Sequence, residues 1–315
     1  MIVAEMSANH DCDIEIAKET IRAAKRAGAD AIKMQTYTPD TMTLDCNLED
    51  FKVTGGTIWD GKYLHELYQK ASLPWEWHKE LFSLAKSEDL ICFSTPFDIE
   101  SAIFLNKLQN IFKISSGDND FYNLIEKVLS FNKPIIISTG MLNYKEIKKL
   151  YNFIKINKFK NQICFLHCVS SYPAPIKELN LNSIVYLKEK FPDCIIGYSD
   201  HSDSIESCVL SAYLGAEVIE KHFTLDKNFS KFRDHKLSAN PSDLKNLVKK
   251  IKIVEEILGD NKKKIFKSEK NVFNQTRRYM CSKKNLTKDS ILDVNNVCWV
   301  RGGDGSKPIK NFQKK

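Results

Sequence analysis

Eight short apolar runs, rich in β-branched residues, are spaced along most of this 315-residue chain. They cover residues 2–4, 31–34, 91–93, 111–114, 134–137, 163–166, 194–198 and 218–220. The stretches between them carry apolar residues three and four positions apart, which predicts amphipathic helices, notably at 14–27, 144–156, 181–191 and 205–214. Strands that alternate with helices form right-handed βαβ units around a parallel sheet. Eight such units predict an α/β fold closed into a (β/α)8 TIM barrel.

Every predicted strand ends in residues with polar side chains. In chain order the ends offer Glu5, Lys33 with Gln35, Thr95, Lys113 with Ser116, Ser138, His167 with Ser170, Ser199 with His201, and Glu220 with His222. A single polar residue after a strand is usually part of a loop or a helix cap. In a barrel, however, all eight ends converge on one rim, where the active sites of this fold lie. The pattern therefore predicts a site on that rim.

The connection after the second strand, about residues 36–90, is much longer than the others. It contains helix-like segments at 62–71 and 77–87 and an aromatic run at 75–78. An excursion of this size beside an active rim can fold over a substrate. Packing is the alternative role for its tryptophans, and it is the one we favour.

The pattern changes after residue 258, where a lysine-rich stretch precedes several short β-like segments. We predict a catalytic barrel over residues 1–260, a linker over 261–276 and a small β-rich module over 277–315. The positive net charge of +7 comes entirely from the C-terminal residues 245–315. Lysines there alternate with isoleucines at helical spacing, so a solvated helix face explains them better than a nucleic-acid surface does.

Composition argues against several classes of protein. No apolar run approaches the roughly 20 residues of a membrane span, and we find no secretory signal. The nine cysteines are scattered and form no CxxC pair, as in a reduced cytoplasmic protein. Neither a P-loop nor a GxGxxG segment occurs, which argues against a nucleotide. We therefore expect a cytoplasmic protein that binds neither nucleic acid nor membrane.

Two lysines indicate an anionic substrate. Lys33 and Lys113 end separate strands, among the hydroxyl groups of Thr95, Ser116 and Ser199. Two ammonium groups surrounded by hydroxyl donors suit a phosphate and a carboxylate. The alternative is that one of the lysines points outward and is solvated.

Two histidines indicate a metal. His201 and His222 follow consecutive strands, with Asp200 and Glu220 beside them. A lone histidine at a strand end is more often structural, but a pair on neighbouring strands suits Mn, Fe, Co or Zn. So few protein ligands would leave positions open for water and substrate, as in a catalytic site.

The motifs at these strand ends resemble those of the sialic acid synthase family, the phosphoenolpyruvate-dependent synthases of nine-carbon nonulosonic acids. The matching segments are residues 4–10, 33–36, 93–97, 113–117, 138–141, 167–173, 197–201, 220–223 and 234–238. The resemblance implies a TIM barrel followed by an antifreeze-like (SAF) domain, of which the chain carries a truncated first half. It also implies a domain-swapped homodimer.

The resemblance further implies a role for each matching residue. Phosphoenolpyruvate would be held by Lys33, Thr95, Lys113, Ser116, Ser170 and Ser199. A manganese-like ion, with Mg²⁺ or Co²⁺ as alternatives, would be held by His201 and His222. The acceptor sugar would meet Glu5, Gln35, Tyr172 and Asp234, together with Arg301 of the partner subunit. Glu5 or Glu220 would orient the water that completes the reaction.

The implied reaction condenses phosphoenolpyruvate with an N-acetylated amino-sugar aldehyde and releases phosphate. The long connection resembles the pseudaminic acid branch of the family, whose acceptor is 2,4-diacetamido-2,4,6-trideoxy-L-altrose. Residues 116–118 and 234–238 resemble the N-acetylneuraminate and legionaminate branches, which use N-acetylmannosamine or its diacetamido relative. Two other classes stay open. A sugar-phosphate aldolase or a related synthase would need a further basic site for the acceptor's phosphate, and an inert barrel would act as a binding protein.

Overall fold

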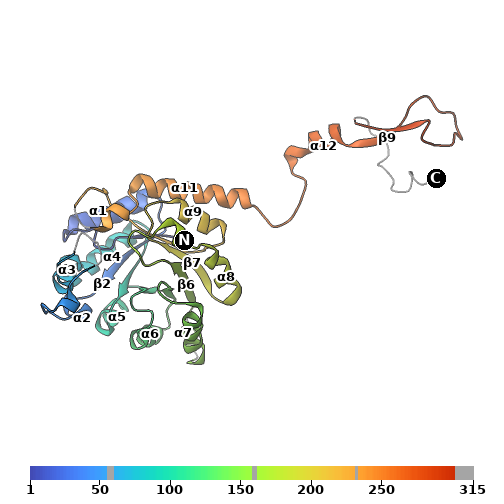
Figure 1. Cartoon of the computed structure of the whole chain (residues 1–315). Coiled ribbons are helices and arrows are strands. Elements are labelled where there is room, and N and C mark those ends of the chain that lie inside the picture. Colours follow the sequence, from blue (N-terminus) through green and yellow to red (C-terminus); the bar gives the residue numbers. More distant parts are fainter. Residues whose placement is uncertain (55–59, 158–161, 231–232, 302–315) are drawn as a thin grey trace. The chain divides into compact units, whose positions relative to one another are not determined.

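The eight predicted strands are all present in the computed structural model, which describes residues 1–54, 60–157, 162–230 and 233–301. They are β1 (Ile2–Glu5), β2 (Ala31–Thr36), β3 (Ile91–Pro96), β4 (Phe112–Ile114), β5 (Ile135–Ser138), β6 (Ile163–Cys168), β7 (Ile195–Asp200) and β8 (Ile219–His222). They form one parallel sheet in the order β3-β2-β1-β8-β7-β6-β5-β4. Strands β3 and β4, at the two ends of that order, also contact each other. The sheet is therefore a nearly closed barrel, which confirms the predicted (β/α)8 fold (Figure 1).

Helices surround the barrel on its outer side (Figure 1). The helices of this part of the chain are α1 (Ile14–Ala27), α2 (Pro39–Met42), α3 (Leu64–Ala71), α4 (His78–Ser87), α5 (Ile99–Leu105), α6 (Tyr122–Leu129), α7 (Tyr144–Ile156), α8 (Asn182–Lys190), α9 (Glu206–Tyr213), α10 (Arg233–Leu237) and α11 (Pro241–Leu258). The short helix α10 is the exception to the outer placement, because its Asp234 lies beside His222 at the end of β8. Their ends follow local sequence signals. Asp13 caps α1 by accepting from two backbone amides, and Gly28 ends it in the left-handed conformation, with φ at +95°. A side chain at Gly28 would also crowd Val248 of α11.

The apolar core has two parts. The larger part lies between the strands and the surrounding helices. The smaller part fills the barrel itself and consists of Val3, Ala31, Phe93, Ile136, Cys164, Leu166 and Val218. Because side chains alternate between the two faces of a strand, this inner cluster identifies which residues of each strand point into the barrel.

The long connection between β2 and β3 contains α2, η1 (Glu49–Phe51), α3, η2 (Trp75–Trp77) and α4. The ring of Trp75 stacks on Phe104 of α5 at 4.9 Å between centroids, and its indole nitrogen donates to the carbonyl of Tyr37. Packing, the role we favoured for the tryptophans, is thus what Trp75 performs. None of the helices in the described ranges has the length and apolar character that a bilayer crossing requires.

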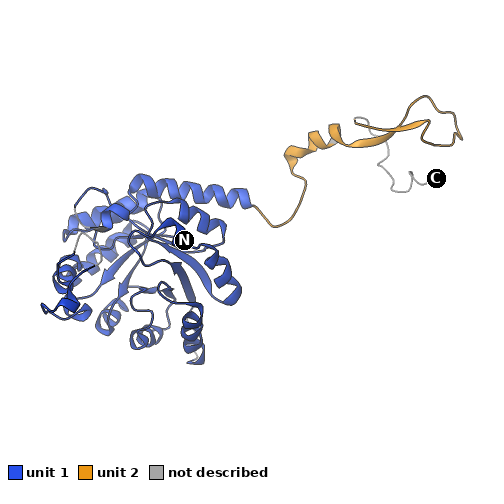
Figure 2. Ribbon diagram, viewed as in Figure 1, with its two compact units in different colours: residues 1–258 blue, residues 259–315 orange. Residues whose placement is uncertain are grey.

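The chain divides into two units, residues 1–258 and residues 259–315, coloured separately in Figure 2. The second unit contains η4 (Lys267–Glu269), α12 (Lys270–Thr276), β9 (Arg278–Ser282) and β10 (Val297–Arg301). Helical structure therefore occupies part of the segment predicted as a linker. Strands β9 and β10 form an antiparallel pair in which Arg278 lies opposite Arg301. The remainder of the predicted module, residues 302–315, lies outside the described residues.

A buried ion pair joins β7 to β8 on the outer face of the barrel. The ammonium of Lys221 lies 2.7 Å from the Asp200 carboxylate, and both side chains are almost fully buried. Asp200 also accepts from the hydroxyls of Tyr198 and Ser202. Burial opposes the Asp200 charge, but Lys221 and these hydrogen bonds outweigh it and lower the pKa of the carboxyl. The pair fixes the two strands that carry the candidate metal ligands.

We predict that Lys221→Met lowers the free energy of unfolding by about 3–5 kcal/mol, because it leaves the Asp200 carboxylate buried without its counter-charge. Urea unfolding followed by circular dichroism measures the change. Lys25→Met is the matched control, since Lys25 pairs at 3.4 Å with Asp89, whose side chain is fully exposed. Equal stability of the two variants would contradict a structural role for the buried pair.

Candidate active site

A polar layer lies directly above the apolar cluster inside the barrel. Two positions beyond Val3, Ala31, Phe93, Ile136, Leu166 and Val218 on the same strands are Glu5, Lys33, Thr95, Ser138, Cys168 and Glu220. The period of two places these side chains on the inner face, toward the carboxyl ends of the strands. The strand register agrees with this placement, because Glu5 of β1 lies opposite Lys33 of β2 on one side and opposite His222 of β8 on the other. The predicted rim site thus has an apolar floor and a polar layer.

Buried opposite charges hold this layer together. The ammonium of Lys33 lies 2.6 Å from Glu5 and 3.7 Å from Glu220, and the ammonium of Lys113 lies 3.7 Å from the same Glu220 oxygen. Lys33 also donates to the Thr95 hydroxyl at 3.3 Å, and the Ser199 hydroxyl donates to Glu220 at 3.2 Å. Both lysines are therefore directed inward, and the alternative of a solvated lysine is excluded.

The two carboxyl groups have opposite protonation tendencies. Burial opposes the charge of Glu220, but Lys113 and Lys33 outweigh it and hold its pKa at about 2. Burial and the negative charge of Glu220 raise the pKa of Glu5 despite the nearby Lys33. Divergent pKa values in neighbouring groups are typical of acid–base sites. Of the two carboxyl groups, Glu5 therefore takes up a proton more readily than Glu220.

The two lysines also differ. Burial favours the neutral form of both. In Lys33 the carboxylates of Glu220 and Glu5 outweigh burial and raise the pKa of the ammonium. In Lys113 burial and the neighbouring positive charge of Lys33 lower the pKa.

Hydroxyl and thiol groups form a tight cradle beside Lys113, around Gly140. The Ser116 hydroxyl lies 3.0 Å from the Cys168 sulfur, which is 4.0 Å from the Ser170 hydroxyl. A Cβ atom at Gly140 would lie 2.2 Å from Oγ of Ser170, 2.6 Å from Oγ of Ser116 and 2.8 Å from the Cys168 sulfur. Only glycine fits here without displacing these groups.

The two histidines lie side by side, with ring centroids 5.5 Å apart. His201 uses Nδ1 to donate to the carbonyl of Val169 at 2.9 Å, which leaves the Nε2 lone pair for another partner. Nδ1 of His222 is buried and has no hydrogen-bond partner. Burial lowers the pKa of both rings, so they are neutral, the form that binds metals. The donor set fits a divalent ion.

Asp200 does not support that ion directly, although its position in the sequence suggested that it might lie beside the histidines. Its carboxylate points to the outer face, where it pairs with Lys221. The inner face near the histidines is instead taken by Ser199 and Glu220. Over the described ranges, no group of three or more His, Cys, Asp or Glu residues has the arrangement of a metal site. A metal held by the histidine pair would therefore leave coordination positions to water or substrate.

Three more of the predicted sugar-contacting residues lie around Glu5 and the histidines. The Gln35 amide donates to Glu5 at 3.0 Å, and Asp234 of α10 lies 3.9 Å from Nδ1 of His222. The Tyr172 ring lies 4.2 Å from the His201 ring and 6.0 Å from the His222 ring. The remaining sugar-contacting candidate, Arg301, is exposed on β10 of the second unit.

Three inner-face residues, Ser7, Ser138 and Cys168, were not assigned a role in the sequence analysis. Ser138 and Cys168 are detectable from the alternation along β5 and β6, because each lies two positions beyond an inner apolar residue. Ser7 follows β1 in a loop and has no such periodic signal. Its hydroxyl contacts Asp234 and Gln35.

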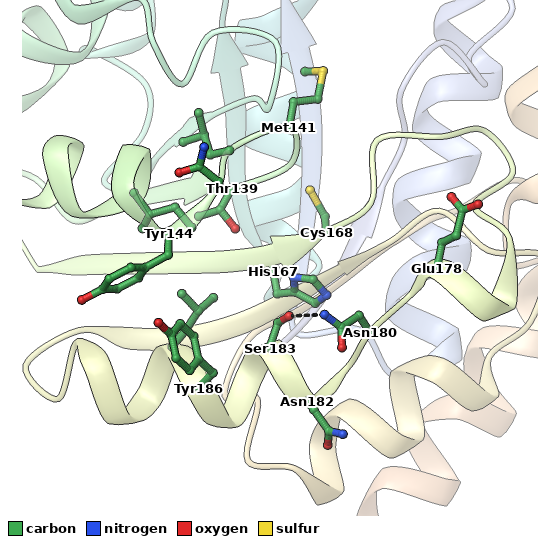
Figure 3. A pocket seen from close by; sticks show the side chains of 14 residues that line it. Thr139, Met141, Tyr144, His167, Cys168, Glu178, Asn180, Asn182, Ser183 and Tyr186 are labelled. Carbon is green, nitrogen blue, oxygen red and sulfur yellow. Dashed lines mark hydrogen bonds between the residues drawn. The ribbon is translucent and has the colours of Figure 1, made fainter.

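A separate pocket of about 560 Å³ opens between the ends of β5 and β6 and the helices α7 and α8 (Figure 3). Its labelled lining includes Thr139, His167, Asn180 and Tyr186. The His167 ring, on the outer face of β6, bonds to the carbonyl of Leu179 at 2.7 Å. The pocket adjoins the polar layer only through Cys168 and contains neither of the buried lysines. It therefore lies beside the candidate site and shares Cys168 with it.

Two buried ammonium groups, several hydroxyl donors and a pair of neutral imidazoles on the rim of a (β/α)8 barrel define a site for a small anionic substrate. The chain belongs to the NeuB family, whose model matches residues 20–263. The resemblance to sialic acid synthases is thereby confirmed.

Curated relatives match nearly the whole chain. It is 41% identical over 309 residues to a pseudaminic acid synthase of Campylobacter jejuni, covering 98% of this chain and 88% of the relative. It is 38% identical to an N,N'-diacetyllegionaminic acid synthase of the same species, covering 98% and 92%. Among solved structures, the N-acetylneuraminic acid synthetase of Leptospira borgpetersenii superposes with a TM-score of 0.77. It shares 32% identity with this chain, and the match covers 86% of this chain and 89% of that one.

Proposed function

We propose that this protein is a phosphoenolpyruvate-dependent nonulosonic acid synthase, a transferase that forms a carbon–carbon bond and releases phosphate. The observation that carries the proposal is the polar layer of Lys33, Lys113 and hydroxyl donors above a sealed apolar floor. Two buried ammonium groups match the two anionic ends of phosphoenolpyruvate. The similarity to synthases of three nonulosonic acids supports the same assignment.

Phosphoenolpyruvate would lie between the two lysines, with its charged groups also accepting from Thr95, Ser116, Ser138, Ser170 and Ser199. This placement exchanges the internal pairing of Lys33 and Lys113 with Glu220 for pairing with the substrate. The barrel floor excludes water from below, which strengthens each of these interactions.

His201 and His222 would hold a divalent ion, for which we infer Mn²⁺, with Mg²⁺ or Co²⁺ as alternatives. When bound, such an ion supplies Lewis acidity toward the aldehyde oxygen of the acceptor. The neutral state leaves each ring a lone pair for the ion, and the bond from Nδ1 to the Val169 carbonyl orients Nε2 of His201 as a ligand. Tyr172 contacts the His201 ring at a tilt and the His222 ring edge-on, which limits their movement.

The reaction requires C3 of phosphoenolpyruvate to attack the aldehyde carbon, water to add at C2, and the C2–O bond to phosphate to break. Lys33 and Lys113 stabilise the charge on the phosphate and carboxylate throughout. Glu5, whose pKa is raised by burial, is the side chain suited to accept the proton of the attacking water; Glu220 is the alternative. Gln35, Asp234 and Tyr172 would orient the acceptor.

We infer that the product is pseudaminic acid, formed from 2,4-diacetamido-2,4,6-trideoxy-L-altrose. The long connection after β2 supports this branch, as does the 41% identity to pseudaminic acid synthase. The second candidate product is legionaminic acid or N-acetylneuraminic acid, which residues 234–238 and the 38% identity to the legionaminic acid synthase favour.

Phosphate release from phosphoenolpyruvate should be fastest with the altrose acceptor and should need a divalent ion. The rate should fall at least about 100-fold in His201→Ala or His222→Ala, because each variant loses a metal ligand. A purified-enzyme phosphate assay with each acceptor measures this. His65→Ala, in α3 of the long connection after β2, is the control and should keep wild-type phosphate release with its metal dependence, because the His65 ring pairs with Asp40 rather than with either candidate ligand. Turnover of N-acetylmannosamine alone would reject the pseudaminic assignment, whereas no turnover with any acceptor would favour a binding protein.

Gly140→Ala should lower kcat/KM for phosphoenolpyruvate by about 100-fold, because the added methyl group displaces the Ser116 and Ser170 hydroxyls by roughly an ångström. Gly117→Ala is the matched control in the neighbouring loop. A Cβ there meets only the Ser115 hydroxyl, at 3.5 Å, an ordinary contact. Wild-type kinetics in Gly140→Ala would show that the cradle does not bind the substrate.

We also propose that the second unit belongs to an antifreeze-like domain and that two chains pair so that Arg301 reaches the acceptor in the partner's barrel. The antiparallel pairing of β9 with β10, which ends at Arg301, supports this proposal. Light scattering of the intact protein should give twice the 36.2 kDa of one chain. A monomeric mass would contradict the pairing.

A further inference from the structure

Ser7 occupies a backbone conformation that favours glycine. It follows β1, is 7% exposed, and has φ at +49°, in the left-handed region. A residue with a Cβ atom is disfavoured there, whereas glycine adopts this conformation freely. We therefore expect the side chain of Ser7 to make contacts that compensate for the disfavoured backbone conformation.

The Ser7 hydroxyl joins two residues assigned to the acceptor sugar. It donates to Oδ2 of Asp234 at 2.5 Å and accepts from Nε2 of Gln35 at 3.4 Å. The backbone amide of Ser7 donates to Oε1 of Glu5 at 3.1 Å, the oxygen that also accepts from Gln35. Ser7 thus contacts Glu5, Gln35 and Asp234, which come from three separate segments of the chain.

These contacts determine which atoms of Gln35 and Asp234 are not used by Ser7 and Glu5. A hydroxyl donates one hydrogen bond while accepting others, so Ser7 can serve Asp234 and Gln35 together. With both hydrogens of its amide directed to Glu5 and Ser7, Gln35 presents its carbonyl oxygen. Asp234, held through Oδ2, presents Oδ1. Both presented atoms accept hydrogen bonds.

We propose that Ser7 is a positioning residue that orients Gln35 and Asp234 as a pair of hydrogen-bond acceptors for the incoming sugar. The pair selects an acceptor that offers two donors, such as a hydroxyl and an amide N–H. This role rests on the proposed function, since it assumes that these residues contact the sugar. Ser7 itself touches neither the lysines nor the histidine pair through the contacts described.

Two substitutions separate the hydroxyl from the backbone. Both Ser7→Ala and Ser7→Gly remove the hydroxyl. Alanine keeps a Cβ atom in the disfavoured backbone conformation, whereas glycine adopts that conformation without strain. Each should lower kcat/KM for the acceptor by about 10- to 100-fold, the effect of losing a hydrogen bond to a charged group, and leave KM for phosphoenolpyruvate unchanged. Ser7→Gly should melt about 2–4 °C above Ser7→Ala. Steady-state kinetics and thermal unfolding of the intact protein measure both effects.

Asp11→Gly is the matched control, because Asp11 lies in the same loop with φ at +50° but is exposed. It should keep wild-type kinetics. The double variant Ser7→Ala with Asp234→Asn should lose less than the product of the two single losses, since the residues act through one contact.

An active wild type whose Ser7→Gly variant keeps the wild-type kcat/KM for the acceptor would overturn the positioning role alone. So would independent losses in the double variant, or an equal rise in KM for phosphoenolpyruvate. A wild type that releases no phosphate with any acceptor would reject the proposed function, and the role of Ser7 with it.

Discussion

The interior of the barrel depends on one interaction, the pairing of the Glu220 carboxylate with the ammonium groups of Lys33 and Lys113. Two ammonium groups buried with no counter-charge would cost far more free energy than a domain of this size can spare. Glu220 and Glu5 provide that counter-charge, and the apolar floor beneath them keeps the charges out of water. The result is a preorganised cationic site that needs little rearrangement to receive an anion.

Strand alternation explains how a short sequence places so much chemistry on one face. Along β8, Glu220 and His222 face the interior while Lys221 faces outward to Asp200. The outward pair fastens β8 to β7, and the inward residues form the site. One strand of four residues therefore contributes both to the rigidity of the rim and to its reactivity.

Much of this arrangement could be predicted from the sequence because it is periodic. The eight strands and the helices α1 and α7 follow from apolar spacing, and the alternation of Lys33 with Gln35 predicts that both side chains face the same way. Asp200 shows where proximity in the sequence misleads. It precedes His201, which suggested a place beside the metal, but the alternation along β7 directs its side chain to the outer face. Ser7 could not be assigned, since neither its left-handed conformation nor its contact with Asp234, 227 positions away, leaves a periodic trace. The helices η4 and α12 within the predicted linker had no sequence signal, because the lysine-rich composition of residues 261–270 resembles that of a flexible connection.

The division between the apolar floor and the polar layer has an evolutionary consequence. Residues such as Val3, Phe93 and Val218 contribute to stability, while residues two positions beyond them contribute chemistry. Because the two sets occupy different depths, substitutions among the neutral residues at the mouth, outside the buried charge pairs, can alter the choice of substrate with little effect on folding. A barrel built in this way can acquire a new acceptor through changes at its mouth while its interior stays the same.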